Sequence, residues 1–145
     1  MIEVREARGD AERAAAFALR HEVFVVEQGV PIELELDEDD ETALHLVAFD
    51  DDRLAGTCRV VMGTPPAPKA KFGRLVVARD ARGAGIGSAL LDEAERRARA
   101  DGARQMVLTA QIAAMGLYER AGYTARGEVF LDAGIEHMTM EKALA

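Results

Sequence analysis

A run of glycines stands between an apolar stretch and an amphipathic stretch, and this junction limits the possible folds more than any other part of the sequence. Leu75-Val76-Val77 is typical of a buried central strand. A strand that turns through the glycine segment at 82–87 into a helix is the first half of a β-α-β unit, and a short apolar stretch at 105–110 supplies the second strand. The helix is indicated by apolar residues at the spacing of one helix face: Ile86, Leu90, Leu91, Ala94 and Ala98.

The rest of the chain predicts strands on both sides of this unit and a short second helix at 113–120. The strands are expected at 2–5, 44–49, 54–62, 71–78, 123–130 and 136–141. The prolines at 64–68 predict a surface loop. This order of elements indicates an α+β fold with one parallel crossover, and 145 residues are the length of a single domain, over 1–145.

The N-terminal segment predicts one helix and then a strongly acidic stretch. The helix is expected to begin at a cap residue, Asp10, and to end before Gly29. Residues 33–41 hold seven carboxylates in nine positions, and their mutual repulsion predicts a loop or an exposed edge. We interpret this stretch as a solvated face, with attraction of a cationic amine as the alternative. The buried face of the helix is predicted from residues at helical spacing: Ala14, Phe17, His21 and Phe24.

Charge and composition exclude several classes of partner. A formal net charge of −8, from 26 acidic and 18 basic side chains, repels nucleic acid and anionic lipid, so neither is expected as a partner. No apolar run approaches the roughly 20 residues of a spanning helix, so neither a signal peptide nor a membrane segment is expected. The single cysteine, Cys58, forms no intramolecular disulfide and no thiolate metal site. We therefore expect a cytoplasmic protein without a bound metal.

The glycine segment also predicts a site for a phosphate or pyrophosphate group. Glycines let a ligand approach the backbone, and the free N–H groups at a helix start favour an anion, beside which Arg82 adds a cation. ATP is disfavoured because no lysine stands between Gly87 and Ser88, and NAD because the glycines lack the G-x-G-x-x-G spacing. The alternative is a turn that serves only the chain reversal.

Two motifs, separated by one helix and one strand, resemble those of a known enzyme family. Arg82-x-x-Gly85-x-Gly87, preceded by Leu75-Val76-Val77, is similar to motif A of the GNAT superfamily of acetyl-coenzyme A-dependent N-acyltransferases. Gln111-x-x-Ala114-x-x-Leu117-Tyr118-x-x-x-Gly122-Tyr123 is similar to motif B of that superfamily. The segments at 22–28 and 130–137 resemble its ElaA-like branch, so the resemblance covers nearly the whole chain.

This resemblance implies a central mixed, mostly antiparallel sheet of six or seven strands flanked by helices. A parallel strand pair would splay open between Val77 and Ala110 to take acetyl-CoA as co-substrate, with no metal. Gln111 stands where the wider superfamily more often has asparagine. The residues implied to bind coenzyme A are Leu75, Val76, Val77, Arg82, Gly83, Ala84, Gly85, Ile86, Gly87, Ser88, Gln111 and Tyr118.

The resemblance further implies roles in catalysis. Tyr118 would be the general acid that protonates the leaving thiolate, and the backbone N–H of Val77 the oxyanion donor; a tyrosine that only fills the gap between helix and sheet is the alternative. The carboxylate that many relatives use as a base is replaced here by Gly73-Arg74. A water relay is one substitute, and the side chains that remain as candidate bases are Glu27, Asp37, His45 and His137, of which His45 is interpreted first as structural.

We therefore predict an N-acetyltransferase that moves an acetyl group directly to a primary amine in a ternary complex. The alternatives are a catalytically inert module that binds coenzyme A and, more weakly, a nucleotide phosphotransferase. The expected partners are acetyl-CoA, an amine acceptor and a second copy of the chain paired through its C-terminal strands. Arg59 and Arg74, on adjacent predicted strands, would either recognise an anionic substrate group or pair with the surrounding acids.

Overall fold

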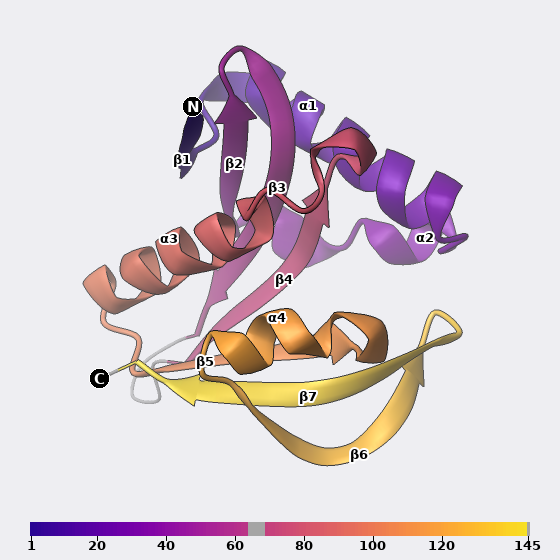
Figure 1. Ribbon diagram of the computed structural model, residues 1–145, viewed down its shortest axis with the longest axis vertical. Coiled ribbons are helices and arrows are strands. Elements are labelled where there is room, and N and C mark those ends of the chain that lie inside the picture. Colours follow the sequence, from indigo (N-terminus) through magenta and orange to yellow (C-terminus); the bar gives the residue numbers. More distant parts are fainter. Residues whose placement is uncertain (64–68, 145) are drawn as a thin grey trace.

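In the described part of the chain, residues 1–63 and 69–144, seven strands form one mixed sheet in the order β1-β2-β3-β4-β5-β7-β6 (Figure 1). This arrangement is that of a computed structural model, and the predicted proline loop at 64–68 lies outside the described residues. Each predicted strand is confirmed, within a few residues of its expected ends. The strands are β1 (Ile2–Glu6), β2 (Leu44–Asp50), β3 (Arg53–Met62), β4 (Lys69–Val77), β5 (Gln105–Gln111), β6 (Thr124–Asp132) and β7 (Ile135–Ala143).

Among the described strands, β4 and β5 form the one parallel pair, and the others are antiparallel. The chain crosses from β4 to β5 through helix α3 (Ile86–Ala100), which confirms the predicted β-α-β unit. The two parallel strands pair only where Lys69, Ala70 and Lys71 face Gln105, Met106 and Val107. Beyond these positions they separate and leave a slot between their carboxyl ends, as the GNAT resemblance implies.

Helix α1 (Gly9–Arg20) differs from its prediction at its start and in the face that it buries. Arg8 is the N-cap and Asp10 lies inside the first turn, so the prediction that Asp10 caps the helix is wrong. After Arg20 the chain continues as a π-helix, His21–Glu27, whose wider turn changes the phase of the side chains. The predicted face is wrong at Ala14 and His21, which are exposed, whereas Phe17 and Phe24 are half-buried as predicted. The residues that α1 and the π-helix bury are Ala16, Leu19, Arg20 and Val23.

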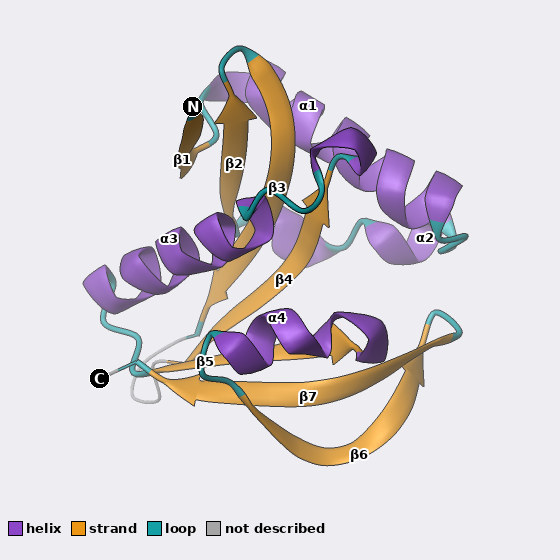
Figure 2. Ribbon diagram, in the orientation of Figure 1, coloured by secondary structure: helices purple, strands orange, loops and turns teal. Residues whose placement is uncertain are grey.

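The other helices are short, apart from α3. They are α2 (Ile32–Glu35), α4 (Met115–Arg120) and the 3₁₀ turns Glu38–Glu41, Arg79–Ala81 and Ile112–Ala114. Helices α3 and α4 cover one face of the sheet, and α1 with the π-helix covers part of the other (Figure 2). Gly56 on β3 permits close packing of α3, because a Cβ there would lie 2.9 Å from the Ile86 side chain and 3.0 Å from the Val76 carbonyl oxygen.

A β-bulge in β4 sets which side chains face the slot. Two residues of β4, Arg74 and Leu75, lie opposite the single residue Cys58 of β3, and Arg74 has a φ of +54°. The extra residue reverses the alternation of side chains along the strand. It therefore turns Arg74 toward α2, and it turns Leu75 and Val77 toward α3 and α4.

Candidate active site

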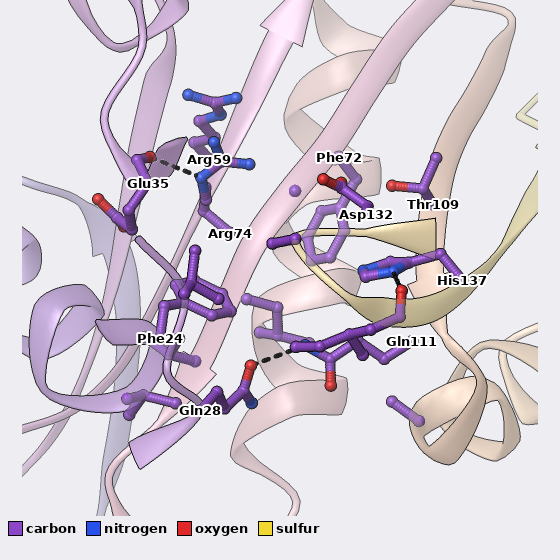
Figure 3. A pocket seen from close by; sticks show the side chains of 18 of the residues that line it. Phe24, Gln28, Glu35, Arg59, Phe72, Arg74, Thr109, Gln111, Asp132 and His137 are labelled. Atoms are coloured by element: carbon purple, nitrogen blue, oxygen red, sulfur yellow. Dashed lines mark hydrogen bonds between the residues drawn. The ribbon is translucent and has the colours of Figure 1, made fainter. Parts of the chain in front are cut away.

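The slot between β4 and β5 opens into a cavity of about 540 Å³ that joins the two faces of the sheet (Figure 3). On the side of α3 and α4 its lining includes Leu75, Val77 and Tyr118. On the opposite side its lining includes Phe24 and His137. Two substrates that enter from opposite faces can therefore meet inside the sheet.

A second hollow, of about 340 Å³, adjoins the slot at the start of α3. Gly83 and Gly85 have φ angles of +85° and +81°, which confirms that the turn needs glycine, and a Cβ built on either would meet no other atom within 4 Å. Because Gly85 is the N-cap of α3, the N–H groups of Ile86, Gly87 and Ser88 have no partner within the helix. The open backbone and the free donors fit a pyrophosphate group.

Two arginines lie beside these amides. Arg82 donates to the Val77 carbonyl oxygen at 3.1 Å and, through both terminal nitrogens, to the Glu27 carboxylate at 2.8 and 2.9 Å. The guanidinium hydrogen bonds hold the pKa of Glu27 below its usual value, so Glu27 is a weak base in this arrangement. Arg120, which sequence reasoning did not single out, lines the same hollow and has no ion-pair partner among the described residues.

The two groups implied to act on the thioester lie at the junction of the hollow and the cavity. The Ala78 N–H donates to the Ala55 carbonyl oxygen at 2.8 Å, and successive N–H groups of a strand point to opposite edges, so the Val77 N–H points into the slot. The Tyr118 side chain is buried among Cys58, Phe72 and Tyr123, and burial raises the pKa of its hydroxyl. No described residue hydrogen-bonds that hydroxyl, which leaves it available to a bound group.

Gln111 lies at the end of β5 and reaches across the mouth of the cavity. Its amide nitrogen donates to the Gln28 side-chain oxygen at 2.8 Å, as Figure 3 shows. Gln28 follows the π-helix, so this hydrogen bond links the two sides of the slot. Gln28 is a second residue that sequence reasoning did not single out.

One wall of the cavity is a network of charged side chains, which we call the arginine wall. Arg20 is 1% exposed and donates to Glu35 at 2.5 Å and to Asp40 at 2.7 Å. Arg59 donates to both oxygens of Asp37, at 2.6 and 2.9 Å. The six members of the arginine wall are Glu35, Asp37, Arg59 and Arg74, which line the cavity, and Arg20 and Asp40, which pair with them without lining it.

The charges of the arginine wall balance, because each guanidinium has a carboxylate partner. The prediction of a loop or an exposed edge at 33–41 is confirmed at most of these positions, which are exposed, but it is wrong at Glu35 and Asp40, which are buried by pairing with Arg20. Of the two interpretations of Arg59 and Arg74, pairing with the surrounding acids is confirmed. The Arg59 hydrogen bonds lower the pKa of Asp37, so Asp37 is also a weak base.

His45 lies behind the arginine wall and does not line the cavity. It is buried on β2, where its Nε2 donates to the Asp40 carbonyl oxygen at 2.8 Å and its ring packs edge-on against Phe17. Burial lowers its pKa. These contacts confirm the structural interpretation of His45.

The opposite wall is formed by the tip of the β6–β7 hairpin with one residue of β5, and we call it the hairpin wall. His137 Nδ1 lies 2.7 Å from the Ile135 carbonyl oxygen, and the ring stacks on Phe130. A carbonyl oxygen only accepts, so Nδ1 carries the proton and Nε2 is free in the neutral ring. Figure 3 shows the imidazole directed into the cavity. The members of the hairpin wall are Thr109, Asp132, Ala133, Ile135 and His137.

The cavity therefore brings together most of the residues singled out in the sequence. Those that line it or the adjoining hollow are Leu75, Val76, Val77, Arg82, Gly83, Gly85, Ile86, Gly87, Ser88, Gln111, Tyr118, Asp37 and His137. Glu27 reaches the site through Arg82. Thr109 and Asp132, which also line it, were missed; Asp132 shows in the sequence only as a turn residue.

No group of three or more histidine, cysteine, aspartate or glutamate side chains is placed to hold a metal ion in residues 1–63 and 69–144. Within those same ranges, none of the helices has the length and apolar character needed to cross a membrane.

Comparison with known proteins identifies the family of this chain. The profile of the acetyltransferase (GNAT) domain family matches residues 7–144. YjcF of Bacillus subtilis, named as an uncharacterized N-acetyltransferase, is 36% identical over 137 residues, which are 94% of this chain and 96% of YjcF.

Solved structures give the same grouping. The crystal structure of Escherichia coli ElaA has a TM-score of 0.87 and 25% identity, and the match covers 98% of this chain and 99% of ElaA. That of an acyl-CoA N-acyltransferase from Pseudomonas aeruginosa has a TM-score of 0.83 and 30% identity, over 99% of both chains.

Proposed function

Since the chain belongs to the GNAT acetyltransferase superfamily, we propose that its single domain, over 1–145, transfers an acetyl group from acetyl-CoA to a primary amine, directly and in a ternary complex. One observation carries the proposal. The free amides at the start of α3 lead into a slot through the sheet, and the Tyr118 hydroxyl faces that slot without a partner among the described residues.

On this proposal the donor lies along the slot. The amides of residues 83–88 hold the pyrophosphate, with Arg82 and Arg120 beside it. The free edge of β4 at Leu75, Val76 and Val77 offers backbone hydrogen bonds to the amides of pantetheine, as an added strand does. Gln111 supplies a further amide, after exchange of its hydrogen bond to Gln28.

The transfer itself needs one donor at the carbonyl oxygen and one at the sulfur. As the amine nitrogen bonds to the thioester carbon, negative charge develops on the carbonyl oxygen, and the Val77 N–H stabilises it. The C–S bond then breaks, and the thiolate receives a proton from the Tyr118 hydroxyl. Burial keeps that hydroxyl protonated at neutral pH, as its raised pKa indicates.

Binding is tested by thermal unfolding of the purified protein with acetyl-CoA, coenzyme A, ATP or NAD. Acetyl-CoA at 100 times its Kd adds about 2.7 kcal/mol to the free energy of unfolding, which raises the midpoint by about 5–10 °C. Gly85→Ala places a Cβ at a φ of +81° in the amide cradle and should remove most of the rise, whereas Gly102→Ala, at a φ of +94° beyond α3, should preserve it. A larger rise with ATP contradicts the proposal.

Turnover is tested by release of the coenzyme A thiol with a panel of primary amines. Tyr118→Phe removes only the hydroxyl and should lower kcat by about 10²–10⁴-fold, with the acetyl-CoA response in thermal unfolding unchanged. Wild-type protein that binds acetyl-CoA but acetylates no amine would instead be the inert coenzyme A-binding module.

A further inference from the structure

The hairpin wall carries polar groups that the proposed donor chemistry does not use. Asp132 lines the cavity, and its carboxylate has no ion-pair partner among residues 1–63 and 69–144. Thr109 and His137 line the cavity as well, and Figure 3 shows the three side chains on the same side of it. His137 Nε2 is free, as described above. A carboxylate, a hydroxyl and an imidazole whose Nε2 has no partner among the described residues thus line one end of the slot.

The register of the sheet places these three side chains on one face. His137 pairs with Gln111 across β7 and β5, and with Phe130 across β7 and β6. Asp132 is two residues beyond Phe130, so it shares the face of His137. Thr109 is two residues before Gln111 on that same face.

We propose that Asp132 and His137 form the acceptor-amine site, in which Asp132 binds the ammonium group and His137 accepts its proton. This inference rests on the proposed acetyl transfer and names the acceptor class as a primary amine that is bound as a cation. Thr109 supplies a further oxygen to the ammonium group. Asp132 and His137 thereby prepare the nucleophile from the face opposite to Tyr118.

The protons of the reaction then balance. One passes from the ammonium nitrogen to His137 Nε2 and on to water, which leaves the nitrogen with the lone pair that bonds to the thioester carbon. A second leaves that nitrogen as the C–S bond breaks and passes through water to the Tyr118 phenolate, which restores the hydroxyl that protonated the thiolate. The products are the N-substituted acetamide and coenzyme A.

The remaining walls select the body of the acceptor. Across the cavity from the hairpin wall, Val23, Phe24, Val30 and Leu34 supply an apolar surface. The arginine wall offers no spare guanidinium to a carboxylate, because its three arginines are already paired. Lys71 lies at the closed end of the slot, where β4 still pairs with β5. The site therefore fits an alkylamine or arylalkylamine rather than an α-amino acid or an amino sugar.

The test measures acetylation of hexylamine, 2-phenylethylamine, leucine and glucosamine, and then uses the best of them with four proteins. Asp132→Asn should raise KM for the amine by about 10-fold or more, because it removes a charge-assisted hydrogen bond, with KM for acetyl-CoA unchanged. His137→Gln should lower kcat by about 10²-fold. Glu136→Gln is the matched control, since Glu136 lies on the same hairpin but on the other face, and it should match wild type.

Each outcome decides a different point. Equal amine KM values for Asp132→Asn and Glu136→Gln, or a wild-type kcat for His137→Gln, overturn the acceptor site while the acetyltransferase function stands. Leucine or glucosamine as the best acceptor overturns the apolar class. Binding of acetyl-CoA without transfer to any of the four amines overturns the proposed function, and the acceptor site with it.

Discussion

The two walls of the cavity differ in how far their polar side chains are paired. In the arginine wall, every charged group has a partner, and Arg20, Glu35 and Arg59 are all less than 5% exposed. In the hairpin wall, Asp132 has no ion-pair partner in the described residues and His137 has one free ring nitrogen. A saturated network has no capacity left for a ligand, whereas unsaturated groups facing a cavity do.

This difference indicates a structural role for the arginine wall and a chemical role for the hairpin wall. The arginine wall joins α1, α2, the 3₁₀ turn at Glu38–Glu41, β3 and β4, and it holds the acidic segment against the sheet. The hairpin wall is a two-stranded projection whose tip is exposed. We therefore expect substitutions of charged groups in the first wall to change stability and substitutions of polar groups in the second to change activity.

The largest effect is expected from Arg20→Met in the arginine wall. It leaves the buried Glu35 carboxylate without its guanidinium partner and takes one of two from Asp40. An unpaired buried charge costs about 3–5 kcal/mol, so the urea midpoint should fall steeply. The control is Arg53→Met, which breaks an exposed pair with Asp80 and should cost at most about 1 kcal/mol. Similar midpoints for the two variants would show that the arginine wall does not hold this face together.

A smaller effect is expected from pH, through the histidine behind the arginine wall. Burial lowers the pKa of His45 in the folded protein, whereas the unfolded chain takes up its proton near pH 6.5. The stability from neutral His45 is therefore complete above pH 6.5 and declines as the pH falls below it, by at most about 1.4 kcal/mol per pH unit. The measurement is the free energy of unfolding in urea between pH 5 and pH 8.

Two substitutions test whether His45 causes this pH dependence of stability. His45→Gln retains a donor to the Asp40 carbonyl oxygen and should flatten the curve between pH 5 and 6.5, whereas His21→Gln, at an exposed position, should not. Below about pH 4 both variants should lose stability, because pairing lowers the pKa of Asp37 and Asp40 and the unfolded chain binds their protons first. An unchanged slope in His45→Gln would show that a group other than His45 causes the pH dependence.

The contrast between the walls can also be sharpened at the tip of the hairpin. Ala133 has a φ of +52° and Gly134 of +78°, and positive φ at both central residues is what a type I′ turn requires. Asparagine tolerates this conformation better than alanine, so Ala133→Asn should raise the free energy of unfolding by about 0.5–1 kcal/mol. Ala125→Asn, on β6 of the same hairpin, is the control, and a similar gain there would rule out the turn as the cause.

The elements around the slot could be predicted because their signals are local. The apolar strand, the glycine turn and the amphipathic helix are contiguous in β4, its turn and α3, and the Gly83 and Gly85 φ angles follow from the same segment. The β-bulge could not be predicted. It depends on pairing with Cys58 of β3, and it places the positive φ on Arg74 and not on the neighbouring Gly73.

The contacts that build the two walls could not be predicted from the sequence either. Nothing in the acidic segment marks Glu35 and Asp40 as the carboxylates that bury Arg20, because their partner lies 15 and 20 residues away on α1. The π-helix shifts the phase of that helix without a proline or glycine to signal it. The sequence identifies Asp132 only as a turn residue, whereas the register of β6, β7 and β5 places it on the same face of the sheet as His137 and Thr109.

The smallest change in stability is expected where the change in activity is large. Asp132→Asn removes a charge with no ion-pair partner in the described residues, so its free energy of unfolding should stay within about 0.5 kcal/mol of wild type, as should that of Glu136→Gln. Asp132→Asn and Arg20→Met are measured with the same urea titration. Arg20→Met should then lose stability, whereas Asp132→Asn should keep its stability and lose affinity for the amine. A loss above about 1 kcal/mol in Asp132→Asn alone would mean that the carboxylate supports the fold, and the two walls would then differ in degree and not in kind.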